Sequence, residues 1–351
     1  VEVSGFGSHA SGHLNLLRLS QQIYPGGESK HHWPTLGLNT LRWAKRQGAI
    51  CGPAHSANGL SNYVGRLGNY RDGPHGLPHF NIPAFDGIGA NEYIVDVTHD
   101  VAGPSGTPVP AIDFISAMNT PRLDEWNMWY HTLNCGYRVR VSGETDFPCM
   151  TGERVGYGRV YVKVDGALNF DDWVTGLQAG RSYVSDGSCH IIDFQARSDD
   201  REEFLGVGER GSEITLDNAS RITCRAKCAT RLLDAESASV ELIANGHPVA
   251  TTTIKADGSL QDVEFDVDVE RSSWLAIRVF QHANSNPFFV IVDEQPIRAS
   301  RASAEWCLRC VEQCWREKQN TYDLDEQQDA REAYEHAREA YQAILAETEE
   351  P

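Results

Sequence analysis

The sequence of 351 residues has no apolar run close to the roughly 20 residues that a membrane-spanning helix needs. Its longest apolar stretches, such as 288–292, have the length of a strand, so we expect no membrane anchor within this chain. Basic residues are also few: Lys and Arg number 31 against 49 Asp and Glu, a net charge of −18. Because such a surface repels phosphate backbones and anionic lipids, nucleic acid and membrane are disfavoured as main partners.

The chain also lacks an initiator Met and a basic-then-apolar leader, since residue 1 is Val. We therefore expect any targeting segment to lie upstream, and the cellular compartment stays open. The nine cysteines are scattered along the length, a pattern that predicts free thiols rather than a disulfide framework. Hydrophobic residues at 40% and charged residues at 23% are ordinary for a globular protein, and the length predicts roughly two or three domains.

Helix and strand signals alternate through residues 1–186. The expected segments are a helix around 41–44, a strand at 49–53, a helix at 123–135, a strand at 137–141, a strand at 159–163 and a helix at 170–179. Such alternation predicts a mostly parallel sheet, with the chemistry at the carboxyl ends of the strands. Because a complete βα barrel takes about 250 residues, we expect an α/β fold in which a partial, distorted barrel lacks its front.

Two further domains are expected after residue 186. Residues 187–299 show short alternating strands with turns such as Asn245-Gly246, which predict a small antiparallel β-sandwich. Residues 300–351 lack Gly and predict a helical tail of two helices joined near 320–323. Its apolar stripe consists of Ala330, Tyr334, Ala337, Tyr341 and Ile344. The stripe is expected to pack either on the barrel or on another subunit, so a homo-oligomer through these helices is one prediction.

Two histidines and two carboxylates lie beside short strands and Gly-rich turns. They are Glu2, His13, His55 and Asp146. Mixed nitrogen and oxygen ligands suit Zn, Mn or Fe, and such a divalent cation lowers the pKa of a bound water toward neutrality. The alternative for each histidine is an ordinary hydrogen-bonded imidazole in the core or on the surface. His9 competes with His13, but only His13 leads directly into the apolar residues 14–17.

The order of several motifs resembles the later part of a PHP (polymerase and histidinol phosphatase) metallohydrolase domain. These motifs are Glu2-Val3-Ser4, Gly12-His13-Leu14-Asn15-Leu16-Leu17, Gly52-Pro53-Ala54-His55, residues 86–92, and Ser142-Gly143-Glu144-Thr145-Asp146. The runs 133–138, 159–162 and 180–184 are similar more narrowly to the CehA/McbA-type branch, named for carbaryl hydrolases. The match covers about residues 1–190, and no single motif is decisive.

This resemblance implies a distorted seven-stranded βα barrel that binds two or three metal ions. It assigns Glu2 to the bridging carboxylate, His13 to the following histidine, His55 to the Ala-His motif and Asp146 to the last metal motif. Two departures matter. The opening His-x-His pair of the family is absent, which leaves the cluster incomplete and predicts weak metal binding and little activity. The last motif usually reads Asp-x-His, whereas Cys149 stands near Asp146 here, as a thiolate ligand or as a packing residue.

Other polar residues have open roles. Glu144 could act as a catalytic general base, as an outer partner of a metal ligand, or as a loop carboxylate bonded to backbone amides. Arg159 and Arg181 could neutralise an anionic substrate or form ion pairs with the abundant acids. Glu92 could face the site from a strand end or be solvated there.

We therefore expect a metal-dependent hydrolase that acts on an ester, carbamate or phosphoester of a small-molecule substrate. The alternative is a non-catalytic binding or scaffold protein with a degenerate PHP barrel. A further hypothesis gives the β-sandwich a carbohydrate-binding surface, which requires accessible aromatic side chains. The leaving group and the metal identity are not predicted.

Overall fold

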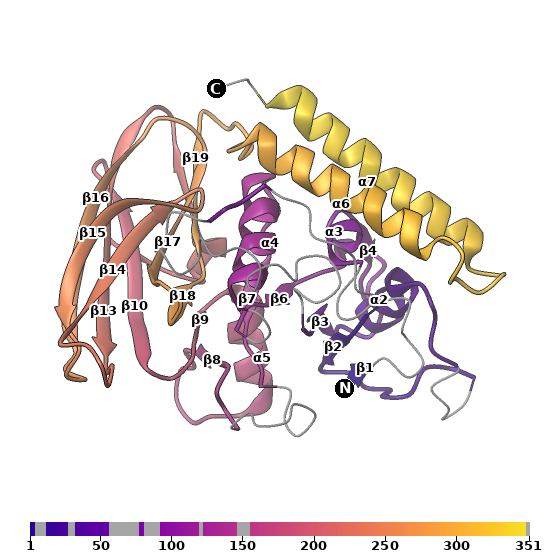
Figure 1. Cartoon of the computed structure of the whole chain (residues 1–351), viewed down its shortest axis with the longest axis horizontal. Coiled ribbons are helices and arrows are strands. Elements are labelled where there is room, and N and C mark those ends of the chain that lie inside the picture. The colour runs from indigo at the N-terminus through magenta and orange to yellow at the C-terminus, as the bar shows by residue number, and fades with distance from the viewer. Residues whose placement is uncertain are drawn as a thin grey trace.

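The computed structural model describes residues 1–3, 12–26, 32–55, 77–80, 92–118, 122–145 and 155–348. Figure 1 shows a β-sandwich on one side, helix α4 (Arg122–Asn134) at the centre, and short N-terminal strands on the other side, with two long C-terminal helices above them. Every residue of α4 from Leu123 to Asn134 is buried. The indoles of Trp126 and Trp129 donate to the carbonyl oxygens of Ala117 and Val139 at 2.7 and 2.9 Å. Helix α4 is thus the centre of the core.

The first part consists of short elements. These are β1 (Glu2–Val3), β2 (Leu14–Leu17), α2 (Gly37–Lys45), β3 (Ile50–Pro53), α3 (Tyr93–Asp96), β4 (Asp100–Ala102), β5 (Pro108–Pro110), β6 (Phe114–Ser116) and β7 (Arg140–Ser142). Strands β1, β2 and β3 form an antiparallel sheet in that order. The amide of Asp113 donates to the carbonyl of Cys51 at 2.8 Å, which places β6 beside β3. Because β6 pairs in parallel with β7, the ends of β3 and β7 lie close together.

Two sheets form the β-sandwich and its extension. Their strands are β8 (Arg159–Val162), β9 (Ser182–Ser185), β10 (Cys189–Ser198), β11 (Leu205–Gly206), β12 (Glu213–Leu216), β13 (Ser220–Thr230), β14 (Ser237–Ala244), β15 (His247–Lys255), β16 (Gln261–Val269), β17 (Ser273–Val279), β18 (Ala283–Ser285) and β19 (Phe288–Val292), with a short 3-10 turn at Glu209–Ser212 and helix α5 (Phe170–Ala179) between β8 and β9. One sheet has the order β11-β10-β13-β16, and the other has β12-β19-β17-β18-β9-β8 with β14 and β15 attached. Their apolar faces meet, as where the rings of Phe194 and Phe288 lie 4.9 Å apart.

The two C-terminal helices are α6 (Arg301–Lys318) and α7 (Gln327–Glu347). The stripe that begins at Ala330 and ends at Ile344 is buried against the same chain. The Tyr341 hydroxyl, for example, donates to the carbonyl of Ile94 at 2.8 Å. The two expected helices are confirmed, and their apolar face is covered within the molecule. A homo-oligomer through these helices stays a prediction.

Two carboxylates fasten this helix pair to the N-terminal part. Glu92 is 1% exposed, and its Oε1 accepts from Lys318 Nζ and from the Tyr322 hydroxyl, each at 2.6 Å. Glu326 accepts from the amide and the hydroxyl of Thr35 at 2.6 Å and from Asn39 Nδ2 at 2.7 Å, at the start of α2. Glu92 therefore belongs to a helix interface and not to a strand end at an active site.

The expected partial βα barrel is wrong. Among the described residues most strand pairs are antiparallel, only β6–β7 and β12–β19 are parallel, and no closed barrel forms. Strands β8 and β9 flank a helix as in a βα unit, yet they pair antiparallel. The amide of Lys163 donates to the carbonyl of Arg181 at 2.8 Å, so the chain leaves and rejoins the sheet at the same end and α5 makes no crossover. In the part of the chain that the structure describes, strands are more numerous than helices.

One continuous sheet contains strands from both sides of the domain boundary that the sequence predicted at residue 186. Strand β9 precedes it and pairs with β18, so the sheet of the sandwich extends into the region assigned to the first domain. Among the described residues, no helix is both long and apolar enough to cross a bilayer.

Candidate metal centre

Three strand ends bring Glu2, His13 and His55 together. Glu2 lies on β1 opposite Asn15 of β2, and His13 directly precedes β2. The amide of Ala54 donates to the carbonyl of His13 at 3.0 Å, so the pairing of β2 with β3 extends to the residue before His55. Antiparallel pairing thus places two histidines 42 positions apart in the sequence at one end of the small sheet.

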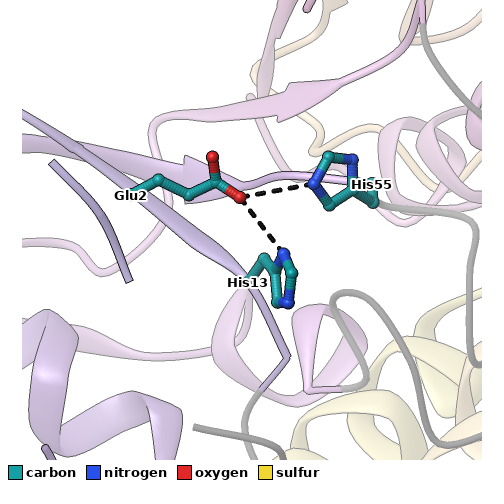
Figure 2. A group of neighbouring side chains, drawn as sticks. All are labelled: Glu2, His13 and His55. Carbon is teal, nitrogen blue, oxygen red and sulfur yellow. Dashed lines mark hydrogen bonds and ion pairs between the residues drawn. The ribbon is translucent and has the colours of Figure 1, made fainter. Parts of the chain in front are cut away.

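Glu2 Oε1 lies between the two imidazoles. It is 3.1 Å from His13 Nδ1 and 3.3 Å from His55 Nε2, as Figure 2 shows. The two rings are 5.0 Å apart at an angle of 72°. The side chains of Glu2, His13 and His55 are 35%, 23% and 5% exposed, so the cluster has a buried side and an open side. A small ligand can reach it from the solvent.

The histidines keep the Glu2 carboxylate ionised. Hydrogen bonds from His13 and then from His55 lower the pKa of Glu2 to about 2, against the opposing effect of partial burial. At neutral pH the cluster therefore presents a negatively charged oxygen between two imidazole nitrogens.

Glu144 lies on the other side of the His55 ring. It follows β7, and its Oε1 is 3.3 Å from His55 Nδ1 and accepts from the backbone amide of His55 at 2.6 Å. Its Oε2 accepts from Asn15 Nδ2 at 2.9 Å. Glu2 and Glu144 thus contact opposite nitrogens of one imidazole, an arrangement that favours the outer-partner role for Glu144 over that of a general base.

The backbone of His55 is held in an unusual conformation. Its φ angle is +50°, in the left-handed region that non-glycine residues seldom adopt. The bond from its amide to Glu144 stabilises this turn. The turn directs the imidazole back toward Glu2, and strained backbone of this kind is concentrated at functional sites.

The chemistry of the three donors fits a divalent transition metal. Catalytic zinc sites have three protein ligands, often two histidines and a glutamate, and leave a fourth position open. Bonds of about 2.0–2.2 Å in a tetrahedron place neighbouring ligand atoms about 3.4 Å apart. The separations of 3.1 and 3.3 Å around Glu2 Oε1 are close to this, and all three donor atoms lie within 4.8 Å of one another.

The remaining predicted residues divide into two groups. Asp146, Cys149 and His9 lie outside the described residues. Arg159 donates to the Tyr161 hydroxyl at 3.0 Å and to the carbonyl of Gly156, while Arg181 pairs with Asp165 at 3.1 Å. The structure thus brings together three of the four predicted metal ligands.

The sequence analysis missed Asn15. It is the one polar residue in the run Leu14–Leu17, and the alternation of a strand directs it away from its apolar neighbours. Its amide holds Glu144, so this break in the apolar pattern was the signal that could have found it.

No family model matches the chain, and no curated protein matches it. A solved structure titled "Crystal structure of the C-terminal domain of wzt" matches with a TM-score of 0.21 and 14% identity, over 31% of this chain and 76% of that chain. This similarity is too low to support a statement about fold or function. The resemblance to PHP metallohydrolases therefore rests on the sequence motifs, and the barrel that it implied is wrong.

Proposed function

We propose that the protein is a metal-dependent hydrolase that holds a Zn, Mn or Fe ion through Glu2, His13 and His55. One observation carries the proposal: the Glu2 carboxylate oxygen lies 3.1 and 3.3 Å from nitrogens of His13 and His55, and each of the three residues lies on or beside a different strand. Such an ion supplies a water activated at neutral pH and a Lewis acid for a carbonyl or phosphoryl oxygen.

The protein groups around the cluster have complementary tasks. Glu144 accepts from the backbone amide of His55 and lies 3.3 Å from Nδ1 of its imidazole, which keeps Nε2 directed at the cluster. Asn15 holds Glu144 in place. Glu2 is ionised and partly exposed, so it can contribute charge at the open side, where a small ester, carbamate or phosphoester would enter.

Metal binding is the first test of this proposal. We expect titration calorimetry of the metal-free protein with Zn²⁺ and Mn²⁺ to detect one saturable site. His55→Ala should remove it, whereas His247→Ala, at an exposed histidine on β15, should leave it unchanged. Equal binding by both variants would contradict the assignment of the ligands.

Turnover is the second test. The probes are p-nitrophenyl acetate, bis-p-nitrophenyl phosphate and a phenyl carbamate, each assayed with and without metal. We expect hydrolysis of at least one probe that disappears with a chelator and in His55→Ala. Metal binding without hydrolysis of any probe would contradict the enzyme and favour a metal-holding binding protein.

A further inference from the structure

We propose that a cavity between β8–β9 and β10–β11 is a binding site for a neutral carbohydrate. The cavity has a volume of about 430 Å³, and its walls come from both sheets of the sandwich region. Ligand pockets typically measure about 300–1,000 Å³, so there is room for roughly one or two sugar rings. The site does not involve Glu2, His13 or His55, and the proposal is independent of the metal centre.

A pair of stacked tyrosines forms one wall. Tyr161 and Tyr183 are directly opposite each other on β8 and β9, and their rings lie 4.9 Å apart at an angle of 7°. Arg159 donates to the Tyr161 hydroxyl at 3.0 Å, and the Tyr183 hydroxyl lies 2.7 Å from Nδ1 of His190. Both rings are therefore fixed before a ligand arrives. Aromatic carbon surface of this kind accepts the apolar C–H groups of a sugar ring.

A buried hydroxyl group adds to the lining of the cavity. Ser285 is 1% exposed and pairs with Tyr183 across β18 and β9, so its side chain lies on the same face of the sheet as the tyrosine wall. Its hydroxyl accepts from the amide of Ile277 at 3.0 Å and donates no hydrogen bond to the described residues. Because an unused buried donor is costly, this proton favours a ligand that is rich in oxygen acceptors.

The charges at the rim neutralise one another. Lys163 pairs with Asp193 at 2.8 Å, and Arg181 pairs with Asp165 at 3.1 Å. With Glu209, the lining has two cations and three carboxylates, so it offers no excess positive charge to an anion. Side chains held in ion pairs still present fixed donors and acceptors at their outer edges. These groups suit the hydroxyls of an uncharged polyol.

A β-bulge shapes this rim. The pairing of β10 with β13 shifts between Ile192 and Gln195, and Asp193 has a φ angle of +52°. Bulges redirect side chains at the edges of sheets, and this one brings Asp193 to Lys163. The unusual backbone conformation at Asp193 therefore helps to place two charged side chains at the rim of the cavity.

The main rival ligand is an extended peptide paired to β8, which is the last strand of its sheet. Such a peptide would be held by backbone hydrogen bonds at the strand edge. It would leave the tyrosine wall and the Ser285 hydroxyl without a role, so we favour the sugar.

An array of neutral mono- to tetrasaccharides tests the proposal, followed by titration calorimetry with the strongest binder. We expect binding by the full chain, a loss of at least tenfold in affinity in Tyr161→Ala, and a change within threefold in Tyr161→Phe, which keeps the ring. Phe170→Ala, at an exposed aromatic residue outside the cavity, should bind as the parent does.

Three outcomes would overturn the proposal: no binding to the array, equal affinity in Tyr161→Ala, or binding of extended peptides in place of sugars. If Tyr161→Ala does not fold, Lys163→Ala decides, because this side chain is 64% exposed and its loss leaves the ring stack intact. We expect a loss of about threefold to tenfold in sugar affinity for Lys163→Ala, and an unchanged affinity would contradict the proposal.

Discussion

Glu2 and Glu92 are each surrounded by hydrogen-bonding partners, but the two clusters differ in burial and in the charge of those partners. Glu92 is 1% exposed and contacts a Lys ammonium and a Tyr hydroxyl. The Glu2 side chain is 35% exposed and contacts two imidazoles. The first carboxylate is paired with a lysine, which cannot ligate a metal as an ammonium, while the second has partners that can also donate lone pairs to a metal.

This difference distinguishes a structural ion pair from a candidate binding site. A buried carboxylate with a full set of partners has no capacity left for a ligand, and its loss leaves an uncompensated charge. A partly exposed carboxylate beside two histidines can still bind a ligand, and the ligand can reach it from the solvent. We therefore expect changes at Glu92 to alter folding and changes around Glu2 to alter binding.

The largest expected effect is on stability at the buried cluster. Glu92→Ala leaves the Lys318 ammonium buried without its partner, and we expect the free energy of unfolding to fall by about 3–5 kcal/mol. Urea denaturation monitored by tryptophan fluorescence measures this loss. The matched variant Glu2→Ala should lose less than about 1 kcal/mol, because exposed ion pairs contribute little. Equal losses of stability in both variants would contradict the distinction between a structural Glu92 and a ligand-binding Glu2.

The second effect is on metal affinity at the open cluster. His55→Ala removes a buried donor, and we expect Zn²⁺ affinity to fall at least about 100-fold. Lys318→Met should leave the affinity of the folded protein unchanged. Competition with a chromophoric chelator measures both, and metal loss in Lys318→Met would show that the two clusters are linked.

A smaller effect is expected at Glu144. Glu144→Ala keeps all three donors but releases the His55 ring, so we expect Zn²⁺ affinity to fall by about 10–100-fold, less than in His55→Ala. Asn15→Ala should act in the same direction with a smaller loss. If Glu144→Ala and His55→Ala lost the same affinity, Glu144 would be a ligand in its own right.

The last expected effect is a pH dependence of stability, which arises in the buried helical region and not at the open site. His131 is fully buried, stacks on Trp306 at 4.2 Å, and has its pKa lowered by burial to about 3. Below about pH 6.5 the unfolded chain binds a proton there that the folded chain does not. Stability should then fall as pH falls, by about 1.4 kcal/mol per pH unit from this residue, until the pH approaches 3.

Denaturation curves from pH 7 to pH 4.5 measure this slope. His131→Gln should reduce it by that amount whatever its effect at pH 7, whereas His32→Ala, at an exposed histidine, should change it little. An unchanged slope in His131→Gln would mean that His131 is protonated in the folded state.

Several elements could be predicted from the sequence because their signals are local. The helix expected at 170–179 is α5, where the Asn169 side chain accepts from the amide of Asp172 and Gly180 ends the helix with a φ of +83°. The helix expected at 123–135 is α4 within one residue at each end. Caps and stops of this kind depend on side chains within a few positions.

Strand direction could not be predicted in the same way. The sequence pattern of β8, α5 and β9 is that of a parallel unit, and the antiparallel pairing depends on where the chain rejoins the sheet. The candidate site contains both a feature that local sequence signals predict and a contact that depends on the tertiary fold. His13 and His55 were found from their position beside strands, but the contact of Glu144 with the far nitrogen of His55 depends on β6 and β7 reaching β3, which no local pattern encodes.

The contact between Glu326 and Thr35 has a consequence for the order in which the protein matures. The first amide of α2, that of Gly37, donates to Glu92 Oε2 at 2.6 Å, whereas the carboxylate that holds the preceding turn lies 291 positions after Thr35. During synthesis Thr35 leaves the ribosome long before Glu326 does. The turn before α2 therefore reaches its final form only after Glu326 has been made, and a nascent chain stalled before that residue would leave Thr35 without this partner.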